Sequence, residues 1–161
     1  MKLKPVLFVS FAAWLSLPCL AADPLIFVKD DDMQGPVGTV TEGDRKDCGF
    51  DLAPHASGEA RGGVPPSIEI TGLPEVGTPV PAPLHLSITL APRGSDVKLS
   101  TLKVLYLRET RKDLTSLVKD RMKNGFFESD VVFPKGQHRI LICVRDNNNL
   151  PAMKVPTFEV K

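Results

Sequence analysis

Residues 84–90 read Leu-His-Leu-Ser-Ile-Thr-Leu. Apolar side chains occupy every second position of this stretch, and polar side chains fill the positions between them. Side chains along a β-strand point alternately to the two faces of a sheet, so this pattern predicts a half-buried strand. Pro83 and Pro92 bound the stretch, because proline interrupts regular structure. This is the clearest structural signal in the 161 residues.

Four other stretches show a strand pattern between shorter segments rich in proline and glycine. They are residues 67–71, 99–107, 138–145 and 155–160. Residues 99–107 are apolar on both faces, which predicts a central place in a sheet. Pro156 predicts an edge position for the last strand, because proline has no N–H group to donate. These patterns predict a mainly β protein.

One segment has a helical period. In residues 113–123 the apolar side chains recur at offsets of three, four and eight: Leu114, Leu117, Val118 and Met122. Asp113 is a suitable N-cap, and Asn124 with Gly125 is a suitable end signal. We therefore expect a short helical insertion here.

A turn signal follows this segment. Val131 and Phe133 lead into Pro134-Lys135-Gly136, in which proline presets a backbone dihedral and glycine stands at the exit. We expect a hairpin that joins this segment to the strand at residues 138–145.

The first residues are typical of a secretory signal peptide. Lys2 and Lys4 precede an apolar run over residues 6–17, and Ala21 and Ala22 follow. The run is shorter than the roughly 20 apolar residues that span a bilayer. We expect residues 1–22 to be removed after Ala21 or Ala22, which leaves a periplasmic or secreted protein without a membrane span. Nucleic acid is then not an expected partner.

The chain has three cysteines, and Cys19 belongs to this leader. A lipoprotein would carry its lipid on Cys19, but Pro18 stands where lipoprotein signals place a small residue. Cys48 and Cys143 remain, and two thiols in an oxidising compartment most simply form one disulfide. Two free thiols or a metal site are the alternatives.

Residues 23–63 differ from the rest of the mature chain. They hold seven of the twelve glycines and nine acidic against four basic residues, a net charge of −5. Residues 64–161 hold ten acidic against fourteen basic residues, a net charge of +4. Low hydrophobicity with excess charge predicts an irregular arm, and the opposite sign of the body would let it fold back.

The arm contains one compact apolar run, residues 25–28. Such a run can add a strand to its own sheet, which we expect here. It can also pair with the edge of another copy, giving strand exchange or a homodimer.

The carboxy-terminal third carries a family resemblance. A proline-glycine turn at 134–136 leads to a strand that ends at Asp146 and an asparagine-rich loop through Asn149. This order resembles the last hairpin of bacterial immunoglobulin-like or fibronectin-like domains, and residues 112–122 resemble a connection in exported bacterial sandwich domains. The resemblance covers residues 64–161 and implies an immunoglobulin-like antiparallel β-sandwich with a binding or assembly role. Unlike antibody-type domains, the mature chain lacks a core tryptophan, because Trp14 lies in the leader.

Metal binding is one alternative function. His85 and His138 would be the first pair to test if their strands were neighbours, with Asp146 as a further ligand. For calcium, the oxygen-rich segments are residues 30–32 and 146–149. Neither set has a recognised ligand spacing, so we expect no cofactor.

Catalysis is the other alternative. The sequence has no nucleophile-elbow, zinc-protease, phosphate-loop or dinucleotide motif. Cys48 and His55 could serve as a thiol nucleophile and its base, as in a small hydrolase, but a disulfide would consume Cys48. We therefore expect a protein that is not an enzyme.

Basic residues concentrate around the expected helix. They are Arg108, Arg111, Lys112, Lys119, Arg121 and Lys123. Such a group of charges attracts an acidic protein, an anionic glycan or the acidic arm of the same chain. The sequence thus predicts an exported binding or accessory protein of the bacterial envelope that acts through this surface.

Overall fold

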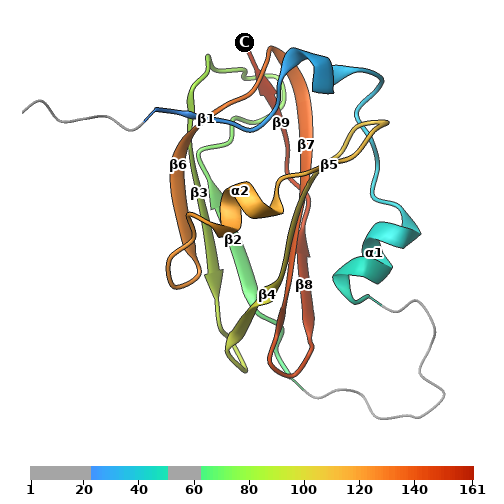
Figure 1. The fold of residues 1–161 in the computed structure, drawn as a ribbon, viewed down its shortest axis with the longest axis vertical. Coiled ribbons are helices and arrows are strands. Elements are labelled where there is room, and N and C mark those ends of the chain that lie inside the picture. The colour runs from blue at the N-terminus through green and yellow to red at the C-terminus, as the bar shows by residue number, and fades with distance from the viewer. Residues whose placement is uncertain (1–22, 51–62) are drawn as a thin grey trace, which may run out of the picture.

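A computed structural model describes residues 23–50 and 63–161 (Figure 1). This part of the chain is mainly β and forms two sheets that share one apolar core. None of its helices is long and apolar enough to cross a membrane. The expected signal peptide, Cys19 and His55 lie outside the described residues.

The first sheet has the strand order β1-β6-β3-β2. Its strands are β1 (Leu25–Ile26), β6 (Phe126–Val132), β3 (Leu84–Ala91) and β2 (Ser67–Thr71). The prediction for residues 84–90 is confirmed: the four apolar side chains that alternate along β3 are buried, and His85 between them is exposed. β3 pairs antiparallel with both β2 and β6.

The second sheet has the strand order β5-β4-β7-β8, and β9 pairs with the other half of β7. Its strands are β4 (Val97–Tyr106), β5 (Lys112–Asp113), β7 (Gly136–Asp146), β8 (Pro151–Lys154) and β9 (Thr157–Val160). β7 is buried on both faces. Ile140 and Ile142 face the main core, whereas Leu141 and Cys143 face a smaller apolar cluster that also contains Cys48.

The prediction of a hairpin at Pro134 is wrong. β6 pairs with β3 and β7 pairs with β4, so residues 133–135 carry the chain from one sheet to the other. Phe133 is buried between the sheets and lies edge-on to Phe158, with 4.9 Å between ring centroids. The Phe133 ring therefore holds residues 133–135 in the core between the sheets. The Pro134-Lys135-Gly136 turn alone would also allow a hairpin within one sheet.

The expected helix over residues 113–123 is shorter in the structure. Asp113 lies in β5, and α2 spans Thr115–Lys119. The Asp113 carboxylate still accepts a hydrogen bond from the Thr115 N–H group, at 2.7 Å. Asn124 and Gly125 both have positive φ and form a tight turn between Lys123 and Phe126. They make a β-turn of the type that hairpins favour, and they do not cap the helix.

The strand expected over residues 155–160 is replaced by two shorter strands, β8 and β9, the first of which begins at Pro151. β8 ends before residue 155 and β9 starts after Pro156, whose carbonyl oxygen accepts a hydrogen bond from the Ile140 N–H group. The asparagine-rich turn before β8 is confirmed: Asn149 has a φ of 60°, and the Asp146 carboxylate accepts from the Leu150 N–H group.

Three short regular elements lie within residues 23–50 of the arm. β1 pairs in parallel with β6 of its own sheet, as expected for residues 25–28, and the next two residues, Phe27 and Val28, are buried in the core. The 3₁₀ helix η1 (Asp30–Met33) and the helix α1 (Glu42–Cys48) follow. Thr41 and Asp44 form a capping box at the start of α1, and Gly49 ends it in the left-handed conformation.

Candidate interaction surface

The six basic residues predicted as one patch have different roles in the structure. Arg108 is buried, Arg111 and Lys112 are paired with carboxylates of the arm, and three others are exposed. The exposed ones are Lys119, Arg121 and Lys123. The arm therefore occupies one half of the predicted patch.

Arg108 joins the arm to the body. Its guanidinium group donates to the Gly35 carbonyl oxygen of the arm at 3.1 Å and to the Gln137 carbonyl oxygen of β7. It also donates through Nε to the Tyr106 hydroxyl at 3.0 Å. A buried cation with this many acceptors is a structural element and is not open to a partner.

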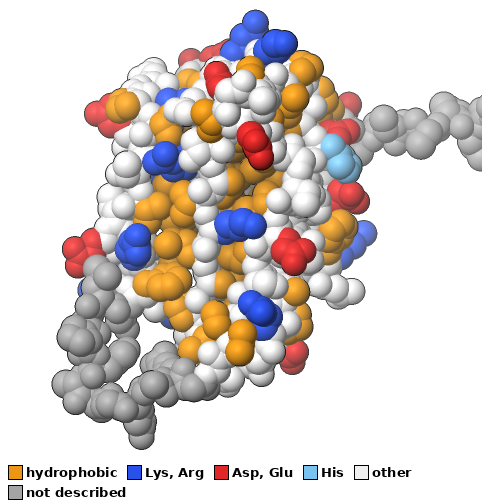
Figure 2. Space-filling view, turned by 180° about the vertical axis from the view of Figure 1, so that it is seen from behind, with side chains coloured by type: hydrophobic (Ala, Val, Ile, Leu, Met, Phe, Trp, Pro, Cys, Tyr) orange, Lys and Arg blue, Asp and Glu red, His pale blue; other side chains and the backbone are white. Residues whose placement is uncertain are grey.

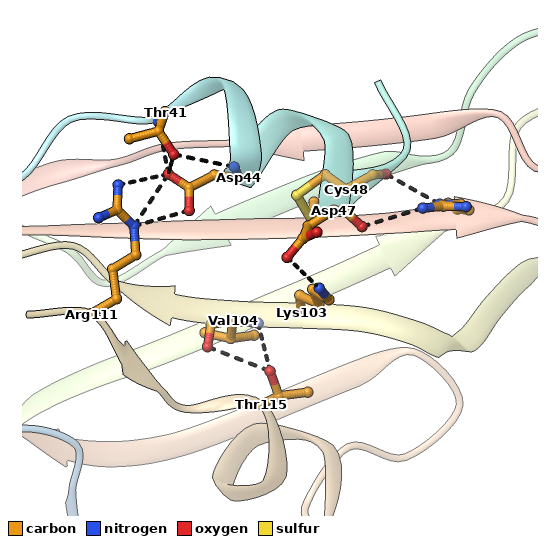
Figure 3. A network of polar contacts seen from close by, with 10 residues as sticks. Thr41, Asp44, Asp47, Cys48, Lys103, Val104, Arg111 and Thr115 are labelled. Carbon is orange, nitrogen blue, oxygen red and sulfur yellow. Dashed lines mark hydrogen bonds and ion pairs between the residues drawn. A yellow bond between two sulfur atoms is a disulfide. The ribbon is translucent and has the colours of Figure 1, made fainter. Parts of the chain in front are cut away.

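Arg111 binds Asp44, the capping residue of α1 (Figure 3). The guanidinium group donates to both carboxylate oxygens at 2.8 to 3.2 Å. Burial raises the pKa of Asp44, but the hydrogen bonds from Arg111 and from Thr41 outweigh burial and leave the pKa of this carboxyl below its usual value. Such a two-pronged contact is among the stronger polar contacts in proteins.

Asp32 of η1 accepts a hydrogen bond from Lys112 of β5. This bond is the main reason that the pKa of Asp32 lies below its usual value, and the backbone N–H of Lys29 contributes. The carboxyl-terminal end of α1 is held in a similar way, since Asp47 pairs with Lys103 at 3.1 Å (Figure 3).

The disulfide between Cys48 and Cys143 is confirmed. It joins the last residue of α1 to the middle of β7, so it fastens the arm to the second sheet. Arg145 donates to the carbonyl oxygens of Asp47 and Cys48 beside it, each at 3.2 Å. The arm is thus attached through a covalent bond, ion pairs and buried apolar side chains together.

Two of the exposed cations lie beside one exposed aromatic side chain. Arg121, Lys123 and Phe126 line a shallow hollow together with Glu128, and Lys119 stands at the end of α2. Phe126 has 43% of its surface exposed. Within the described residues, none of the three cations forms a salt bridge. We call Lys119, Arg121, Lys123 and Phe126 the basic loop surface.

The acidic residue in this hollow has another partner. Glu128 accepts from His85 Nε2 at 3.0 Å, and Asp130 contacts His85 Nδ1 at 2.9 Å. The hydrogen bonds to Asp130 and then to Glu128 raise the pKa of His85 above its usual value. Glu128 is therefore directed toward His85, and the cations of the basic loop surface stay available.

The three residues named as metal ligands are not brought together. His85 lies on β3 in the first sheet, whereas His138 and Asp146 lie at opposite ends of β7 in the second sheet. The two histidines therefore do not lie on neighbouring strands. In residues 23–50 and 63–161 no group of three or more acidic, histidine or cysteine side chains is placed to hold a metal ion.

The oxygen-rich segments named for calcium serve the fold. Asp32 in η1 bonds to Lys112 and to the Lys29 N–H group. One oxygen of Asp146 holds the turn into β8, and its other oxygen has no hydrogen-bond partner among the described residues.

His138 is fully buried. Phe133 and Phe158 pack around its ring, with centroids 5.2 and 5.3 Å away, and the Tyr106 hydroxyl contacts Nδ1. The sequence held a signal for this position. His138 shares the two-residue period with Ile140 and therefore faces the core with it.

Seen from behind, the molecule shows apolar side chains over the middle of its surface (Figure 2). Exposed apolar side chains elsewhere in the described residues include three valines. Val64, Val76 and Val80 are 41 to 50% exposed. The Lys154 ammonium group donates to the Ile68 carbonyl oxygen on the free edge of β2, at 3.3 Å. A lysine across a strand edge hinders pairing with another chain, so this side is protected against strand addition.

Comparison of the chain with protein-family models, with curated proteins and with solved structures finds no match. What is established is therefore that residues 23–50 and 63–161 form a mainly β fold of two sheets, whose arm is fastened by the Cys48–Cys143 disulfide.

Proposed function

We propose that this chain is an exported, non-enzymatic binding or accessory protein that holds an acidic partner on its basic loop surface. The main support for this proposal is that the six predicted basic residues separate into a group that binds the arm and a group that stays exposed. The arm neutralises Arg111 and Lys112, while Lys119, Arg121 and Lys123 stay exposed without salt bridges in the described residues, beside an exposed Phe126. The partner is an envelope or extracellular protein with an acidic surface.

An immunoglobulin-like fold is part of this proposal. The antiparallel order β2-β3-β6 in one sheet and β4-β7-β8 in the other corresponds to strands A-B-E and C-F-G of that fold. Two features depart from antibody domains. β1 joins β6 in parallel, and the disulfide links the arm to β7 where antibody domains link their two sheets.

Export is supported by two independent features. The lysines and the apolar run of residues 2–17 are typical of a signal peptide. Disulfides such as Cys48–Cys143 form and persist in oxidising compartments, and they are rare in the cytosol.

The basic loop surface has the chemistry that a protein interface uses. Exposed ion pairs contribute little each, about 0 to 1 kcal/mol, so the cations would mainly speed and orient the encounter. Phe126 supplies apolar area that a partner can cover, and aromatic and arginine side chains are enriched at interfaces. The combination favours a protein partner with carboxylates around a small apolar contact.

A charge reversal tests the proposal. The Arg121→Glu, Lys123→Glu variant is expected to recover the acidic partner from an envelope extract at least about tenfold less well than wild type, because like charges then face each other. Lys98→Glu with Lys135→Glu is the matched control, since both lysines are exposed and the net change is the same. Quantitative mass spectrometry of the captured proteins gives the readout. Equal recovery by the variant and the control would reject this surface.

A further inference from the structure

The arm is held partly through a buried chain of hydrogen bonds that contains a titratable group. His138 Nε2 lies 2.9 Å from the Pro134 carbonyl oxygen, and Nδ1 lies 3.0 Å from the Tyr106 hydroxyl. The carbonyl oxygen can only accept, so Nε2 carries the hydrogen atom. In the neutral ring Nδ1 then accepts the hydrogen of the Tyr106 hydroxyl.

The Tyr106 hydroxyl also contacts Met33 of the arm. It accepts from Arg108 Nε at 3.0 Å, and its oxygen lies 3.0 Å from the Met33 sulfur of η1. The hydroxyl has one hydrogen atom and two possible acceptors, His138 Nδ1 and the Met33 sulfur. Because a thioether is the weaker acceptor, the hydrogen atom belongs to the contact with neutral His138.

The surroundings of His138 oppose a positive charge. β4 and the residues that follow it contribute Tyr106 and Arg108, while the β6–β7 connection and β9 contribute the rings of Phe133 and Phe158. η1 contributes the Met33 sulfur and Asp32, whose carboxylate is bound to Lys112. Burial, and next the positive charge of Arg108, lower the pKa of His138, against the opposing effect of the Pro134 carbonyl group.

Protonation would disrupt this arrangement. With hydrogen atoms on both ring nitrogens, His138 Nδ1 and Arg108 Nε would both donate to the Tyr106 oxygen. The tyrosine hydrogen atom could then go only to the Met33 sulfur. Two buried cations would also lie close to one phenol. Lifting η1 off the body would admit water to all of these groups.

We propose that residues 29–38 form a pH-sensitive latch, which is closed on Tyr106 and Arg108 while His138 is neutral and opens when His138 is protonated. Both ends of the segment stay fixed, because Val28 is buried in the core and Cys48 is bonded to Cys143. Opening separates Asp32 from Lys112 and adds a free cation to the body. That last consequence rests on the proposed function, whereas the latch itself does not.

The direction of the pH dependence follows from the lowered pKa. The closed state holds His138 at a lowered pKa, so it binds fewer protons than an open state in which water reaches the ring and its pKa moves toward the ordinary value of about 6.5. The preference for the closed state is therefore complete above about pH 6.5. Below this value the preference for the closed state decreases as the pH falls, because the open state then takes up more protons than the closed state.

Amide hydrogen exchange in the mature, disulfide-bonded protein tests the latch. The Gly38 N–H group donates to the Leu107 carbonyl oxygen at 3.1 Å and reports on the arm, while the Leu107 N–H group donates to Arg139 within the body at 2.9 Å. Between pH 6.5 and 5.5, after correction for intrinsic exchange, we expect the protection of Gly38 to fall by up to about fivefold and that of Leu107 to stay constant. An unchanged Gly38, or an equal loss at both amides, would overturn the proposal.

A second measurement also uses the mature wild-type protein. The ring signals of His85 and His138 are followed by NMR as the pH is lowered, and His138 is expected to titrate below His85. A titration of His138 at or above about pH 6.5 would overturn the latch. The Arg121→Glu, Lys123→Glu variant separates the two proposals, since it should keep the exchange response of Gly38 even if it loses the partner.

Discussion

Replacing Cys48 and Cys143 together by alanine is expected to lower the free energy of unfolding by about 4 to 5 kcal/mol. The two residues are 95 positions apart, and cross-linking such a distance removes much of the entropy of the unfolded chain. The loss is a large part of the 5 to 15 kcal/mol that stabilises a typical domain. Guanidinium unfolding followed by circular dichroism measures it, because the only tryptophan lies in the expected leader.

Two controls separate the disulfide from its surroundings. Wild-type protein in reductant should unfold at nearly the same denaturant concentration as the double variant. Asp47→Asn removes the exposed ion pair with Lys103 and keeps the disulfide, so its effect should stay below about 1 kcal/mol. A double variant within about 1 kcal/mol of wild type would mean that the disulfide does little to fasten the arm.

Phe27→Ala is expected to cost about 3 to 5 kcal/mol, the range for removing a buried aromatic ring. The Phe27 side chain has no exposed surface, and its ring centroid lies 6.1 Å from that of Phe127 and 5.6 Å from that of Phe133. A residue of the arm thus completes the core between the sheets. Thermal and guanidinium unfolding of the variant give the loss directly.

The preceding residue supplies the control. Ile26 is 56% exposed, so Ile26→Ala should change stability by less than about 1 kcal/mol. Similar small losses in both variants would show that the arm does not pack into the core. A large loss confined to Phe27 would support the arrangement of β1 against β6.

Local patterns predicted several strands but not their partners. The alternation along residues 84–90 shows which side chains are buried, and the structure confirms it for β3. The same alternation cannot tell whether β7 follows β6 in one sheet or crosses to the other. That choice depends on Phe133, which contacts Phe158 from the far end of the chain. The division between β8 and β9 at Pro156 depends on pairing with β7 in the same way.

Net charge was a poor guide to the arm. Its acidic residues suggested an irregular segment, but Asp32 and Asp44 have basic partners about 70 to 80 residues away in the chain. These partners also explain why the predicted patch divides. Arg108, Arg111 and Lys112 are close to the other cations in sequence, yet the fold turns them toward the arm. The disulfide could be predicted once Cys19 is assigned to the leader, because the two remaining cysteines allow one pairing.

The most direct test of the account locates an acidic ligand on the surface. A hexaglutamate peptide is added to the mature protein at low salt, where exposed charges are least screened, and backbone amide shifts are followed by NMR. The largest shifts are expected within residues 119–126, with little change at Arg108, Arg111 and Lys112. Shifts that centre on those three residues, or no saturable shift at residues 119–126, would contradict it.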